Sequence, residues 1–367
     1  MRLRRRCPVL AALATSAVLV LAGCGGGGGG APAAPAAAEP ATSPAPTTTP
    51  AGTVVSAGGN GPEGIAVDAA GRAIIALRDV SGLALVDVAA DGSTASVRQV
   101  VTGISQSARH IDLATPAGPA LVPLEGTNEL LTVDLGSGAV TSKGTGVGNG
   151  PHNAVRTADG TDVVTNEHGG GVVFVRDGQV LSSLPAGPPQ PGGLAAVGRY
   201  AAVADVQGHG VFVYDGTTRT QVAQKAVGSL LTHALTLAAP GEGDGAGAAV
   251  GVVAFADTSG GAVELERITS VGAQVTVQDV ARIDAPGSPY GLGYDAARSL
   301  LFVTLTATNQ LRVVDVADPA NPRVLGDLPT VRQPNSVAVD PRSGSVLVTG
   351  SAKGELQVIP RALLPTG

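Results

Sequence analysis

The sequence predicts an all-β protein: a seven-bladed β-propeller of four-stranded blades, closed by an N-terminal strand in the last blade. Two observations support this fold class. A weak unit of short strands and Gly- or Asp-containing turns recurs along residues 53–367, and its strands are rich in β-branched residues, as at 172–175 and 211–214. Units of about 40 to 50 residues with four strands each are typical of propeller blades. Helical periodicity is absent from this region of the sequence.

Each repeat begins with a short opening segment that leads into an apolar strand. Clear copies begin at Gly61, Gly150, Ser288 and Gln333, and less regular ones at Ala108, Gln190 and Leu231. The third residues of these openings recur at intervals of 40 to 57 residues: Glu63, His110, His152, Gly192, His233, Tyr290 and Asn335. The longest interval contains a Gly-rich insertion at 241–247. Seven blades account best for this spacing, with six or eight as alternatives.

The two ends of the repeat region complement each other. The last unit has three strands and ends without a fourth, whereas residues 53–56 form a short β-branched strand ahead of the first unit. We therefore assign residues 53–56 as the outer strand of blade seven. Such a strand closes the ring and removes the exposed edges that an open sheet presents.

The N-terminus has the layout of an export signal. Four arginines within the first six residues precede an apolar stretch at 9–22, which is short for a membrane span, and then Gly23 and Cys24. Small residues directly before a cysteine resemble the lipobox of bacterial lipoproteins. That resemblance implies a signal peptide at 1–23, a lipid on Cys24, and anchoring to the outer face of the cell membrane. The alternative is an ordinary secretory signal with a chance cysteine.

Residues 24–52 carry the lipidated cysteine and a stretch of Gly, Ala, Pro and Thr with one charged residue, Glu39. This composition cannot bury a core, so we expect a disordered tether. The propeller domain then spans residues 53–367. The only other cysteine, Cys7, leaves with the signal, so the mature chain contains no disulfide.

Charge and motifs exclude several functions. The formal net charge is −6 with the arginines of the signal included, so the exported part is more acidic still and a nucleic-acid partner is not expected. The sequence lacks a G-x-S-x-G elbow, a Walker loop and an H-E-x-x-H motif. It also lacks Trp, which argues against a quinone or sugar platform.

The opening repeats carry a family resemblance. With their Pro-containing starts followed by Ile65-Ala66-Val67-Asp68, they resemble the YVTN/NHL group of extracellular propellers. This group includes the YncE-like proteins and the streptogramin lyases. The resemblance covers the whole domain and implies the fold, but it does not specify a function.

Candidate site residues gather on one face of the predicted propeller. The first strand of each blade begins on the same face as the turn that follows the second strand, so all five histidines fall there, together with several carboxylates that include Glu125 and Asp257. Imidazoles and carboxylates that converge on a channel suit zinc or copper. Either Asp112 or backbone carbonyls are expected to fix the ring tautomers. The candidate ligand set is His110, His152, His233, His168, His209, Glu63, Glu167, Asp205, Tyr290 and Asn335.

These residues predict that the face binds a small ligand, a metal ion or a protein partner without catalysing a reaction. A metal-assisted lyase or lactonase is the alternative. The resemblance to streptogramin lyases suggests roles for His152, Glu167 and His168, and Glu63 with Asn335 would begin a lactonase-like metal site. An assembly scaffold, or a channel mouth with merely solvated histidines, also stays open.

Overall fold

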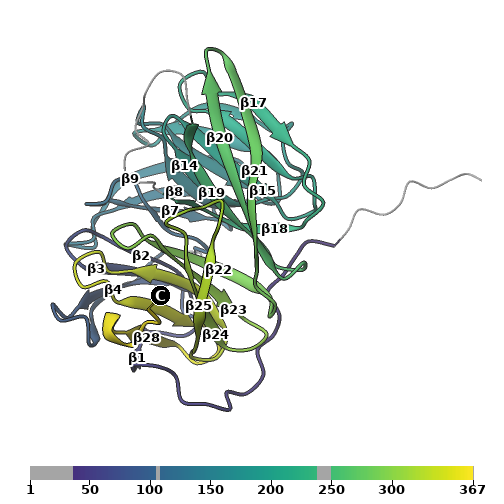
Figure 1. Ribbon diagram of the computed structural model, residues 1–367. Helices are drawn as coiled ribbons and strands as arrows, with labels where there is room; N and C mark the ends of the chain where they lie inside the picture. Colours follow the sequence, from purple (N-terminus) through teal and green to yellow (C-terminus); the bar gives the residue numbers. More distant parts are fainter. Residues whose placement is uncertain (1–35, 105–107, 238–248, 367) are drawn as a thin grey trace, which may run out of the picture. The chain divides into compact units, whose positions relative to one another are not determined.

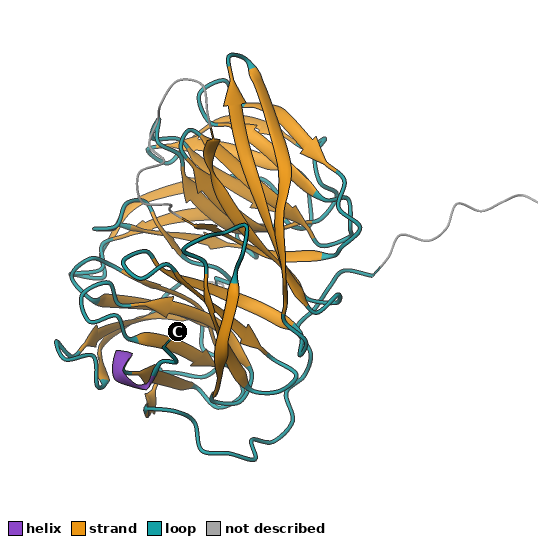
Figure 2. Cartoon of the chain, viewed as in Figure 1, coloured by secondary structure: helices purple, strands orange, loops and turns teal. Residues whose placement is uncertain are grey.

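The computed structural model describes residues 36–104, 108–237 and 249–366, and nearly all of their regular structure is β-strand (Figure 2). A single turn of 3-10 helix, η1 (Arg361–Leu363), follows the last strand. Within these described residues, no helix has the length and apolar character needed to cross a membrane.

The strands group into seven four-stranded antiparallel sheets, which follow one another along the chain (Figure 1). Blades one to three contain β2 (Pro62–Val67), β3 (Arg72–Leu77), β4 (Gly82–Val88), β5 (Ala95–Val101); β6 (Asp112–Leu113), β7 (Ala120–Leu124), β8 (Glu129–Val133), β9 (Val140–Thr145); β10 (Pro151–Arg156), β11 (Asp162–Asn166), β12 (Val172–Arg176) and β13 (Gln179–Leu184). Blades four to six contain β14 (Pro191–Val197), β15 (Tyr200–Asp205), β16 (Val211–Asp215), β17 (Thr220–Lys225); β18 (Leu231–Leu237), β19 (Ala249–Asp257), β20 (Ala262–Val271), β21 (Gln274–Asp284); β22 (Pro289–Asp295), β23 (Leu300–Leu305), β24 (Gln310–Asp315) and β25 (Arg323–Pro329). Blade seven contains β1 (Thr53–Ser56), β26 (Pro334–Val339), β27 (Val346–Gly350) and β28 (Glu355–Ile359).

The predicted seven-bladed propeller is confirmed. Its core lies between the blades, where seven clusters of buried apolar side chains each join one blade to the next. Leu85 of blade one packs in the same cluster as Val122 of blade two, for example. Sheets covered on both faces require continuous apolar strands, which explains the runs of Val, Ile and Leu in the sequence.

Ring closure occurs through the predicted N-terminal strand. β1 pairs antiparallel with β28, with Thr53 opposite Val358 and Ser56 opposite Glu355, so the sheet of blade seven runs in the order β1-β28-β27-β26. The apolar cluster between blades seven and one includes Leu356 and Val358, and Val55 packs against it. Strand pairing and core packing therefore both join the two ends of the domain.

Most first strands carry an irregularity at the site positions. In six blades the pairing register shifts just after the strand begins, because the first strand contains an extra residue relative to its partner. In blade three, for example, the shift lies between Pro151 and Ala154, which places His152 within it. A β-bulge re-aims side chains locally, and in these six blades it includes the third residue of the opening. The bulges thus position the candidate site residues.

The segment ahead of β1 differs from expectation. Composition predicts disorder for residues 24–52, but residues 36–52 contact the propeller. Ser43 is buried; its hydroxyl donates to the carbonyl of Thr306 at 2.5 Å, and its N–H donates to Oε1 of Gln333 at 2.8 Å. The segment needs no core of its own, because polar groups from blades six and seven satisfy its backbone.

Several predictions fall on residues that the structure does not describe. The signal peptide and the lipidated Cys24 lie within residues 1–35, and the Gly-rich insertion lies within residues 238–248. These remain predictions from the sequence.

Ring closure generates a testable prediction. Deleting residues 25–56 removes β1 and exposes the edge of β28, whereas deleting residues 25–52 removes the preceding segment and leaves β1 paired. We expect the longer deletion to have the lower melting temperature and to self-associate, because an unpaired strand edge recruits other chains. Circular dichroism melting and size-exclusion chromatography measure both effects. Identical behaviour of the two variants would contradict the closure role of β1.

Candidate functional site

A compact group of ionisable side chains lies where blades two and three meet. Nδ1 of His152 lies 2.6 Å from Oε1 of Glu125 and 3.0 Å from Oε2 of Glu167. His152 stands at the opening of β10, while Glu125 and Glu167 directly follow β7 and β11. The imidazole is almost fully buried and both carboxylates are mostly buried. One ring nitrogen is therefore enclosed between two carboxylates.

Neighbouring polar groups hold this group in place. Nε2 of Gln190 donates to Oε1 of Glu167 at 3.1 Å, and Nε2 of Gln207 donates to Oε1 of Gln190 at 3.0 Å. On the other side, the guanidinium of Arg109 lies 3.6 Å from Oε2 of Glu125. These contacts connect the openings and turns of blades two, three and four. They fix both carboxylates toward His152.

The two carboxylates determine the protonation of His152. Burial alone would lower the pKa of this imidazole, but the hydrogen bonds and charges of Glu125 and Glu167 outweigh burial and raise the pKa to about 9. Burial would raise the pKa of Glu167, yet the contact with His152 holds that pKa well below its usual range. At neutral pH the imidazole of His152 is thus protonated. Its single Nδ1–H is shared between the carboxylates of Glu125 and Glu167.

A row of aromatic rings extends from His152. The ring of His110 lies with its centroid 4.5 Å from that of His152 and 4.6 Å from that of His233. Tyr290 continues the row, with its centroid 4.2 Å from that of His233 in an edge-on arrangement. These four residues come from the openings of blades three, two, five and six. Three of the candidate histidines and Tyr290 therefore lie side by side in the structure.

The middle rings of the row are neutral at neutral pH. Burial, with the charges of His152, His233 and Arg109, lowers the pKa of His110 well below its ordinary value. Burial and the charge of His152 lower the pKa of His233 to about 3. The single positive imidazole therefore lies at the end of the row that contacts the carboxylates.

The ligand atoms of the three histidines do not meet at one point. Within the described part of the chain, the one group of three ligand atoms that lie within 4.8 Å of one another belongs to Glu125, His152 and Glu167. His110 and His233 stack by their ring faces and edges instead. Of the candidate ligands, the geometry thus brings together His152 and Glu167, and it adds Glu125.

The remaining candidates lie outside this group. Glu63 accepts hydrogen bonds from Asn335 at 2.9 Å and Arg78 at 3.2 Å, which satisfies the pair proposed for a lactonase-like metal site. His209 is exposed, and its Nδ1 bonds to Asp205 within its own turn. His168 is also exposed. These residues share the histidine face but do not converge with His152.

The repeat pattern places Glu125 on this face, but Glu125 was not among the candidate ligands. The contact of Arg109 with Glu125 was not predicted. The position of Glu125 at the end of a second strand matches that of Glu167, so the repeat register alone could have paired the two. Arg109 directly precedes His110 in the opening of blade two, but no spacing rule indicates that its side chain reaches Glu125. That contact became visible only with the side-chain geometry.

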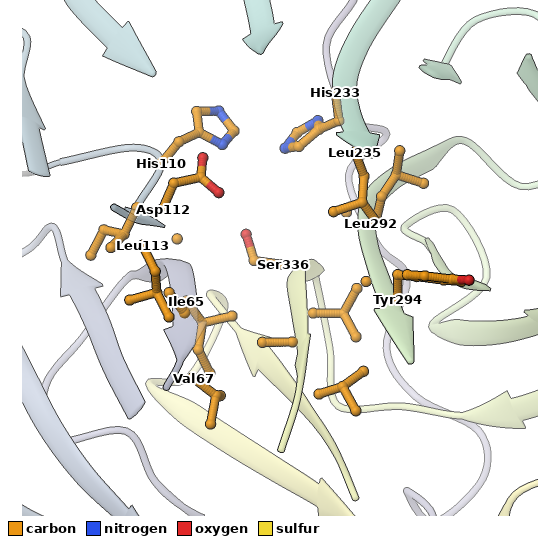
Figure 3. Close-up of a pocket in the computed structure, with 18 of the residues that line it drawn as sticks. Ile65, Val67, His110, Asp112, Leu113, His233, Leu235, Leu292, Tyr294 and Ser336 are labelled. Atoms are coloured by element: carbon orange, nitrogen blue, oxygen red, sulfur yellow. The ribbon is translucent and has the colours of Figure 1, made fainter. Parts of the chain in front are cut away.

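Two rings of the row, those of His110 and His233, line one end of a cavity of about 580 Å³. The cavity is lined by first-strand residues of several blades, and in Figure 3 the imidazoles of His110 and His233 face each other at one end of it. Burial raises the pKa of Asp112, on the same wall, to about 7. Asp112 was expected to orient an imidazole, but no hydrogen bond joins it to one among the described residues.

Comparisons with known proteins agree on the fold alone. No family model matches the chain, and no curated protein matches it. Among solved structures, hydrazine synthase of Kuenenia stuttgartiensis is 14% identical with a TM-score of 0.61, over 83% of this chain and 97% of that chain.

Two lyases of known structure are similar to this chain to about the same degree. A streptogramin B lyase is 14% identical with a TM-score of 0.61, over 82% of this chain and 94% of its own. The virginiamycin B lyase from Staphylococcus aureus is 12% identical with a TM-score of 0.59, over 84% of this chain and 98% of its own. At such identities the likeness defines a fold and not an activity. The chain is a seven-bladed β-propeller with a buried histidine–carboxylate group beside its channel.

The protonation of His152 predicts how stability depends on pH. Because its pKa is higher in the folded chain than in the unfolded chain, its stabilising contribution is complete below about pH 6.5 and is lost as pH rises through about 9. We expect the free energy of unfolding to fall across this range by about 3 kcal/mol at most. A double variant, Glu125→Gln with Glu167→Gln, should lack this decline. Urea unfolding at several pH values measures it, and equal pH profiles for the two proteins would refute the assignment.

Proposed function

We propose that the protein is an exported, lipid-anchored propeller that binds a divalent metal ion, zinc or copper, through Glu125, His152 and Glu167. The bound ion would hold a small ligand on the histidine face without catalysing a reaction. The observation that carries this proposal is the meeting of three ligand atoms within 4.8 Å in a largely buried group.

The donor set suits such an ion. Imidazole nitrogen and carboxylate oxygen are common ligands of zinc, and imidazole also binds copper. Three protein ligands leave a further position for a small molecule, as in sites where zinc keeps one open position. Gln190 fixes Glu167 from behind, which is the outer support that metal-ligating carboxylates usually have.

Charge indicates which small ligand fits. In the metal-free state, the positive charges of His152 and Arg109 balance the negative charges of Glu125 and Glu167. A divalent ion that replaces the proton of His152 adds one net positive charge to the group. The guanidinium of Arg109, 3.6 Å from Glu125, lies beside the position of the ion. A ligand with an anionic oxygen therefore suits the metal-bound state.

The proton on His152 is the competitor of the metal. The nitrogen that would bind the ion carries that proton at neutral pH, because the pKa of His152 is raised to about 9. Metal binding must release the proton, so apparent affinity should increase with pH until the imidazole is neutral.

Export and anchoring rest on the N-terminal sequence. The arginines before the apolar stretch at 9–22, and the small residues before Cys24, favour a lipoprotein signal. The site would then act outside the cell, held at the membrane by its lipid.

A second candidate is a metal-assisted lyase. Two similar folds are lyases of streptogramin B and virginiamycin B by name, and His152 beside Glu167 offers a proton donor beside a carboxylate. In this case the purified protein would open a lactone ring, and His152→Ala would abolish turnover. Metal binding with no turnover favours the binding function.

Metal titration with proton counting tests the proposal. Calorimetry of zinc binding in two buffers of different ionisation enthalpy should show about one proton released per ion near pH 7, because His152 must lose its proton. Glu125→Gln and His152→Ala should each weaken binding by about tenfold or more. His209→Ala, which removes an exposed histidine of the same face, is the matched control and should bind as the wild type does. Equal zinc affinity in all four proteins would overturn the proposal.

A further inference from the structure

The central cavity is a second feature that the metal group does not use. It opens away from the histidine face: its lining includes Thr115 and Pro116, which are exposed, whereas His110 at the other end is buried. Its volume of about 580 Å³ lies within the ~300–1,000 Å³ of small-molecule sites. A ligand would enter from the face opposite the metal group.

Aliphatic side chains form about half of the cavity wall. Side chains of Ile65, Val67, Leu113, Leu235 and Leu292 line it (Figure 3). Such walls gain free energy by covering the apolar body of a ligand, by about 25 cal/mol for each Å² removed from water. The cavity therefore selects for an apolar body.

One carboxylate interrupts these walls. In Figure 3 the carboxylate of Asp112 points into the cavity at the end occupied by His110 and His233. In residues 36–104, 108–237 and 249–366, no side chain forms an ion pair or hydrogen bond with it. Burial alone raises the pKa of Asp112, with no contribution from a neighbouring charge. Asp112 is a carboxylate without a cation at the wall of the cavity, an arrangement that a bound cation would stabilise.

The neighbouring imidazole has an unpartnered ring nitrogen. Nδ1 of His233 lies 3.5 Å from Oγ1 of Thr232, whereas Nε2 is buried without a hydrogen-bond partner among the described residues. His110 and His233 line the end of the cavity that contains Asp112.

We infer that the cavity binds an organic amine with an apolar body, whose ammonium group pairs with Asp112 at the closed end of the channel. An ammonium supplies the positive charge that the carboxylate of Asp112 lacks, and its N–H groups can donate to that carboxylate. The inference uses side chains separate from Glu125, His152 and Glu167. It can therefore fail while zinc binding holds, or hold while zinc binding fails.

Two probes of matched shape test the inference on the purified full-length protein at pH 8. They are 4-phenylbutylamine, an ammonium at that pH, and the neutral 4-phenylbutan-1-ol. Calorimetry should show the amine binding at least about tenfold more tightly than the alcohol. In Asp112→Asn, which keeps the size of the side chain, this preference should disappear while alcohol binding persists, and alcohol binding shows that the cavity is intact.

A second variant separates charge from cavity shape. Leu235→Phe fills part of the cavity without changing its charge, so it should weaken amine and alcohol binding alike. The inference is overturned if the wild type binds the amine no more tightly than the alcohol, or if Asp112→Asn keeps the preference. It is equally overturned if Leu235→Phe leaves the affinity of both probes unchanged.

Discussion

Closure of the ring is the constraint on which the rest of this structure depends. Each blade buries one face against the preceding blade and the other against the next, so an open ring would leave two apolar sheet faces in water. The pairing of β1 with β28 joins the first residues of the domain to the last strand. It also fixes the seven openings around one channel, and side chains from blades two, three, five and six meet there only because the ring is closed.

The sequence was sufficient for this architecture because the repeat period and the orphan strand at 53–56 are properties of the chain itself. It also placed His110, His152 and His233 at equivalent positions of different blades, and in the structure their rings are neighbours. It was insufficient for the ligand set, because ring orientation depends on local bulges and on contacts such as that between Gln190 and Glu167. The contacts of residues 36–52 with the propeller could not be predicted, because composition indicates whether a segment can form a core and not which hydrogen bonds the blade openings offer it.

Electrostatics divides the histidine row into two parts with different chemistry. At one end, two carboxylates keep His152 charged and define a position that a proton or a metal ion can occupy. Further along, burial keeps His110 and His233 neutral, and these rings separate that position from the cavity that contains Asp112. The repeat openings thus provide a cation site at one end of the histidine row. They also line the cavity that contains the carboxylate of Asp112.

The central claim is that one imidazole and two carboxylates, and not three imidazoles, bind the metal ion. X-ray absorption spectroscopy at the zinc edge, on protein loaded with one equivalent of zinc, tests it most directly. The account predicts a single imidazole in the multiple-scattering signal, with the remaining ligands oxygen at about 2.0–2.2 Å. A signal from two or three imidazoles, or from none, would contradict the assignment of Glu125, His152 and Glu167.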